Sequence, residues 1–144
     1  MPQTITLDLP DNFLQPLQRT AHATRLPLEQ LLLRALQATL PPLGDDLPPA
    51  MRENLTALET LDDARLWRVL RETVPARAAT NLHKLLAEQQ ERPLGEAAQG
   101  ALLRLQEQAD LVMLRKARAA VLLRFRGQRI PTLAELSQMS GPLR

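Results

Sequence analysis

The chain has 144 residues with a formal net charge of +2, contains no cysteine, and is 44% hydrophobic but only 2% aromatic. The absence of cysteine excludes disulfides, thiol nucleophiles and thiolate metal sites, and the scarcity of aromatic rings excludes nucleic-acid binding by base stacking. Because leucine and alanine supply most of the apolar residues, the composition predicts a mostly all-α protein with an aliphatic core.

Residues 4–9 read Thr-Ile-Thr-Leu-Asp-Leu, and this alternation of polar and apolar residues is typical of a half-buried β-strand. One side of the strand would carry Ile5, Leu7 and Leu9, and the other side Thr4, Thr6 and Asp8. A single strand cannot satisfy its own backbone hydrogen-bonding groups, so the pattern predicts that a second copy of the chain pairs with it.

Two short helices are expected after this strand. Asp11 or Asn12 can cap the first, which extends to about residue 23, and Pro27 suits the first position of the second. The second helix has an apolar stripe formed by Leu28, Leu31, Leu32, Ala35 and Leu36. A unit of about 40 residues cannot bury enough surface alone, which again favours a dimer.

Four prolines in residues 41–49 predict an extended, semi-rigid linker. The chain therefore divides into an N-terminal unit of residues 1–40, the linker, and a helical module of residues 50–144. That module is expected to contain helices over about 49–59, from Asp62 or Asp63 to just before Pro75, and over 76–91 and 96–126. The last is long and broadly apolar, so it needs cover from the preceding helices or from a partner.

Four arginines of the long helix, Arg104, Arg115, Arg118 and Arg126, fall within one stripe. They can form a solvated face that keeps a leucine-rich helix in solution, or a ridge that binds an acidic partner. Residues 101–144 carry a net charge of +5, whereas residues 44–100 carry −3 and residues 1–43 carry none. The basic end is therefore where an acidic partner is expected.

The residues that catalysis needs are scarce. The two histidines, His22 and His83, have no metal-ligand spacing, the two serines are Ser137 and Ser140, and no phosphate-binding glycine motif occurs. We therefore expect no enzymatic activity, no cofactor and no metal. The N-terminus lacks a signal peptide and no apolar run reaches membrane-span length, which predicts a cytoplasmic protein without a membrane partner.

The strand, proline and two helices of residues 3–40 resemble the ribbon–helix–helix family, the Arc, MetJ and CopG group. The resemblance implies a homodimer whose paired strands enter the major groove of DNA. It implies DNA contacts by Thr4, Thr6, Asp8 and Arg25, and a dimer interface of Ile5, Leu7, Leu9, Leu31 and Leu32. The turn between the helices reads Thr24-Arg25-Leu26, where the family usually has glycine.

Residues 64–67 and 110–117 resemble segments of uncharacterised helical proteins from bacteria. A ribbon–helix–helix unit joined to a partner-binding region is the layout of many type II antitoxins. The resemblance implies a transcriptional regulator that binds operator DNA and, through its C-terminal helices and their four arginines, a nuclease-type toxin. The alternative is a dimeric interaction or scaffold protein whose ribbon serves only assembly, which Asp8 and the uncharged N-terminal region favour.

Overall fold

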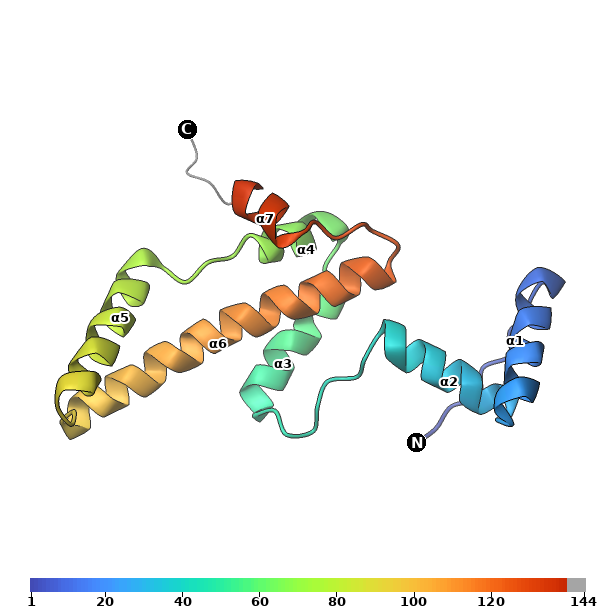
Figure 1. Ribbon diagram of the computed structural model, residues 1–144, viewed down its shortest axis with the longest axis horizontal. Helices are drawn as coiled ribbons and strands as arrows, with labels where there is room; N and C mark the ends of the chain where they lie inside the picture. Colours follow the sequence, from blue (N-terminus) through green and yellow to red (C-terminus); the bar gives the residue numbers. More distant parts are fainter. Residues whose placement is uncertain (140–144) are drawn as a thin grey trace. The chain divides into compact units, whose positions relative to one another are not determined.

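The structure is a computed structural model that describes residues 1–139, and the described chain is mostly helical, as its composition predicted (Figure 1). It divides into two compact units, Met1–Pro42 and Leu43–Arg144. The division falls inside the proline-rich stretch of residues 41–49.

The N-terminal unit consists of two helices, α1 (Asp11–Thr24) and α2 (Leu28–Thr39). α1 begins directly after Pro10, whose carbonyl accepts hydrogen bonds from the amides of Phe13 at 2.9 Å and Leu14 at 3.0 Å. Ala21, in α1, is the one buried residue in this unit. The two helices therefore enclose almost no core of their own.

Residues 4–9 have no regular secondary structure, so the predicted β-strand is not formed within the described chain. A β-strand needs an extended neighbour to which its backbone can hydrogen-bond. The rest of the N-terminal unit consists of two helices and short connections, which cannot supply that neighbour. The prediction of a strand over residues 4–9 is therefore not confirmed for the single chain.

The C-terminal unit contains α3 (Pro49–Ala57), the short 3-10 helix η1 (Leu58–Thr60), α4 (Asp63–Leu70), α5 (Ala76–Glu91), α6 (Glu96–Phe125) and α7 (Leu133–Met139). The predicted helix over residues 76–91 is confirmed, and the predicted helix over 96–126 ends one residue earlier. Residues just before the helices explain where α4 and α5 begin. Asp62 accepts a hydrogen bond from the amide of Arg65 at 2.8 Å, and Pro75 immediately precedes α5.

The core of the C-terminal unit lies where α3, η1 and α4 pack against the second half of α6. Leu55, Leu58, Leu66 and Leu123 are its largest fully buried side chains. The first half of α6 instead forms a hairpin with α5 (Figure 1), and no residue of α5 is fully buried. Different elements therefore cover the two halves of α6.

Candidate functional site

The predicted DNA-facing and dimer-facing residues of the N-terminal segment are nearly all in solvent. Ile5 is 85% exposed and Leu7 is 72% exposed, while Leu9 is half-buried. Thr4, Thr6 and Asp8, the predicted DNA-contacting residues, are all exposed. Two large aliphatic side chains exposed on an irregular segment are unfavourable in water, because their burial would stabilise the protein by about 1.5–3 kcal/mol each.

The two helices of this unit also leave apolar side chains uncovered. Leu31 and Leu32 of α2, predicted at the dimer interface, are half-buried by their own chain. Phe13, Leu33 and Leu36 are more than half exposed, at 62%, 51% and 56%. With Ile5 and Leu7 included, the exposed large apolar side chains of this small unit outnumber the buried ones.

Arg25 lies at the turn between α1 and α2 and has a left-handed backbone, with φ of 55° and ψ of 35°. The next amide, that of Leu26, donates to the carbonyl of Ala21 at 3.0 Å, which closes the end of α1. Glycine adopts this left-handed conformation most readily, yet the residue at this position is an arginine. Its side chain is exposed beside the start of α2.

The arginine stripe of α6 is largely used within the C-terminal unit. The Arg115 guanidinium donates two hydrogen bonds of 2.8 Å to the Glu72 carboxylate and another to the side-chain oxygen of Asn54. The hydrogen bond with Glu72 and the attraction between the charges raise the pKa of Arg115, whereas desolvation lowers it. These contacts attach α6 to α3 and to the chain just after α4.

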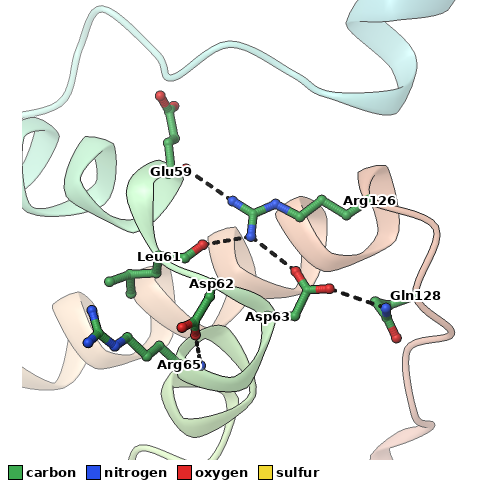
Figure 2. Close-up of polar contacts among 7 residues, drawn as sticks. All are labelled: Glu59, Leu61, Asp62, Asp63, Arg65, Arg126 and Gln128. Carbon is green, nitrogen blue, oxygen red and sulfur yellow. Dashed lines mark hydrogen bonds and ion pairs between the residues drawn. The ribbon is translucent and has the colours of Figure 1, made fainter.

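Arg126 makes a second attachment, at the start of α4 (Figure 2). One of its nitrogens donates to the carbonyl of Leu61 at 2.6 Å and to Asp63 at 3.1 Å. The other nitrogen donates to the carbonyl of Glu59 at 3.0 Å. Gln128 reaches the second carboxylate oxygen of Asp63 at 3.3 Å, so the chain leaving α6 turns towards α4.

Arg118, which is nearly buried, forms an ion pair of 3.1 Å with the Glu59 side chain. Arg104 is exposed, and its side chain makes no hydrogen bond or ion pair within the part of the chain that the structure describes. The structure thus separates the four predicted partner-binding arginines into three that hold the unit together and one that faces solvent.

Sequence reasoning missed the acidic and polar partners of these arginines, Asn54, Glu59, Asp63 and Glu72. The charge distribution contained the signal, because residues 44–100 carry −3 and residues 101–144 carry +5. Opposite charges in adjacent segments of one compact unit can neutralise each other without an external partner.

Within residues 1–139, no group of three or more His, Asp or Glu side chains is placed to hold a metal ion. His22 and His83 are both exposed on their helices. No helix in the described part of the chain is long and apolar enough to cross a membrane.

The protein is mostly helical. Its small N-terminal unit has almost no buried core, and its larger C-terminal unit is held together in part by arginine side chains. Comparisons with protein-family models, with curated proteins and with solved structures found no match to this chain.

Proposed function

We propose that the protein is a homodimeric DNA-binding regulator of antitoxin-like layout. In this proposal, residues 4–9 of two chains pair into an antiparallel ribbon, with Ile5, Leu7 and Leu9 on its covered side. Thr4, Thr6 and Asp8 then face the major groove, and Arg25 lies near a phosphate at the start of α2.

The observation that carries the proposal is the exposure of the N-terminal segment. Ile5 and Leu7 are 85% and 72% exposed, and the whole unit buries only Ala21. A second copy supplies both the missing cover for these side chains and the missing hydrogen-bonding neighbour for the backbone. The placement of two short helices directly after this segment supports the ribbon–helix–helix arrangement in particular.

The antitoxin layout adds a nuclease-type toxin as the ligand of the C-terminal helices. Arg104 is the member of the predicted arginine set that is available for such a contact, since Arg115, Arg118 and Arg126 are held by acidic or carbonyl groups of their own unit. A toxin contact would therefore rest on Arg104 and on apolar side chains of α6 more than on a basic ridge.

A second candidate is a dimeric scaffold in which the ribbon serves assembly alone. The observation that favours it is the charge of residues 1–43, which is zero, together with an exposed carboxylate at Asp8. Affinity for DNA grows with the number of phosphates that are neutralised, and an uncharged unit neutralises few.

A titration of the full chain against the DNA upstream of its gene, followed by fluorescence anisotropy, tests the proposal. Asp8→Asn is expected to tighten binding to non-specific duplex, because it removes a negative charge from the groove. Thr6→Ala is expected to weaken binding to the specific site by about 1 kcal/mol.

Glu91→Gln is the matched control, since it removes an equal charge from an exposed position in the C-terminal unit. It is expected to leave the affinity for DNA unchanged. If neither the unchanged chain nor Asp8→Asn binds duplex at moderate salt, the regulator proposal fails and the scaffold stands.

A further inference from the structure

One face of α6 stays open along the second half of the helix. Arg115 and Arg126 point towards α3 and α4, and Ala117 lies on the opposite side of the helix at 100° per residue. Met113 is 61% exposed, and Asp110, Ala117 and Arg124 are also exposed. Just after α6, Gln128 contacts Asp63 at the start of α4 (Figure 2).

The residues of this face are arranged symmetrically about Ala117. Asp110 lies seven residues before it and Arg124 seven residues after it. Met113 and Val121 lie four residues to either side, and Leu114 and Ala120 lie three residues to either side. An acidic group thus begins the face, a basic group ends it, and apolar side chains occupy the middle with a small residue at the centre.

We infer that this face binds the same face of a second copy of the chain, with the two α6 helices antiparallel and Ala117 on the twofold axis. Asp110 of each copy then meets Arg124 of the other, and Met113 packs against Val121. A parallel pairing would instead place Asp110 beside Asp110 and Arg124 beside Arg124, which is unfavourable at close range. Twofold contacts of this self-complementary kind are the commonest in homo-oligomers.

Two further observations support this occupant. Within residues 1–139, neither the Asp110 side chain nor the Arg124 side chain forms a hydrogen bond or an ion pair, so both charges are available. The small side chain of Ala117 lets two helix axes approach closely at the centre of the contact. The contact lies wholly in the C-terminal unit and does not depend on the proposed ribbon.

Because the chain has no cysteine, a single introduced cysteine reports the register directly. Full-length Ala117→Cys is expected to form a disulfide-linked dimer under mild oxidation, since the two copies of residue 117 lie together at the axis. Leu103→Cys is the matched control, because Leu103 is also exposed on α6, at 60%. In the inferred register its two copies lie about 42 Å apart, at 1.5 Å per residue, so they cannot cross-link.

A charge exchange tests the contact independently of the cysteine chemistry. Adding Asp110→Arg to Ala117→Cys is expected to lower cross-linking to the level of the Leu103→Cys control. Adding Arg124→Asp as well is expected to restore it, because the attraction is then rebuilt with the charges reversed. Circular dichroism confirms that each variant has kept its helical content.

If Ala117→Cys and Leu103→Cys form disulfide-linked dimers to the same extent, whether high or low, the inferred pairing is wrong. Failure of the double charge exchange to restore cross-linking in helical protein would overturn it as well. If the N-terminal ribbon does not form, Ala117→Cys is still expected to cross-link more than Leu103→Cys, and the double charge exchange is still expected to restore cross-linking. Both comparisons are made between variants that share the same N-terminal unit.

Discussion

Arg115 joins α6 to α3 and to the chain just after α4. Its side chain is 22% exposed and that of Glu72 is 33% exposed, so the pair is only partly screened by solvent. The guanidinium meets both carboxylate oxygens of Glu72 and the amide oxygen of Asn54, which fixes its orientation as well as its charge.

Replacing Arg115 with Met is therefore expected to destabilise the C-terminal unit by about 1–3 kcal/mol, because the partly buried Glu72 and Asn54 lose their donor. Urea unfolding of the full chain measures the change. Arg104→Met removes the same charge from an exposed position of the same helix, and it is expected to alter stability by no more than about 0.5 kcal/mol. Equal effects of the two variants would contradict the assigned role of Arg115.

The sequence placed Arg115 and its neighbours on one side of a helix but did not identify what they contact. Helical periodicity is a local property, whereas Glu72 lies 43 residues before Arg115 and Asn54 lies 61 residues before it. The choice between a solvated face and a binding ridge therefore omitted a third possibility, which is attachment to acidic residues of the same unit.

At the scale of elements, the helices were the predictable part of the fold. The prolines and acidic caps at residues 49, 62 and 75 act on their immediate neighbours, so they set helix limits that sequence can specify. The segment 4–9 is different, because its alternation specifies two faces but its strand needs a partner from outside the unit. The strand predicted there is not formed in the described chain, and its pairing with a second copy stays a prediction.

The short helix α7 begins with a reciprocal cap between Thr132 and Glu135. The Glu135 carboxylate accepts from the amide of Thr132 at 2.9 Å, and the Thr132 hydroxyl accepts from the amide of Glu135 at 3.3 Å. The amide of Thr132 and then the guanidinium of Arg129 lower the pKa of Glu135 below its ordinary value.

Since the folded pKa of Glu135 is lowered, its contribution to α7 is present above the ordinary carboxyl pKa and is lost as pH falls through the lowered value. An NMR titration of the Glu135 carboxyl carbon measures this pKa. Arg129→Gln is expected to raise it partly towards the ordinary value, because the backbone hydrogen bond from Thr132 remains. An unchanged pKa in Arg129→Gln would contradict the role of the ion pair.

At the scale of the whole molecule, two separate contacts between chains are proposed, and they can be tested one at a time. Asp110→Arg removes the contact between α6 helices, and this chain is expected to sediment as a dimer held by the ribbon. Adding Leu7→Lys is expected to give monomers or aggregates, because a charge enters the covered side of the ribbon.

Thr6→Lys in the same Asp110→Arg background is the matched control, since it places the same charge on the opposite side of the segment. It is expected to remain a dimer. An undiminished dimer of the chain with both Leu7→Lys and Asp110→Arg would exclude the ribbon as a contact between chains.

In the N-terminal unit Ala21 alone is buried, so if the proposed ribbon forms, the folding of that unit would be a bimolecular event. Its stability then depends on the amount of chain present, and each tenfold dilution lowers it by about 1.4 kcal/mol. The C-terminal unit, with its own buried leucines, has no such dependence for its folding. If the ribbon binds the operator of its own gene, the abundance of the chain sets the fraction of competent repressor. Autoregulation would then need no small-molecule signal, because the fraction of dimeric repressor would rise with the concentration of the chain itself.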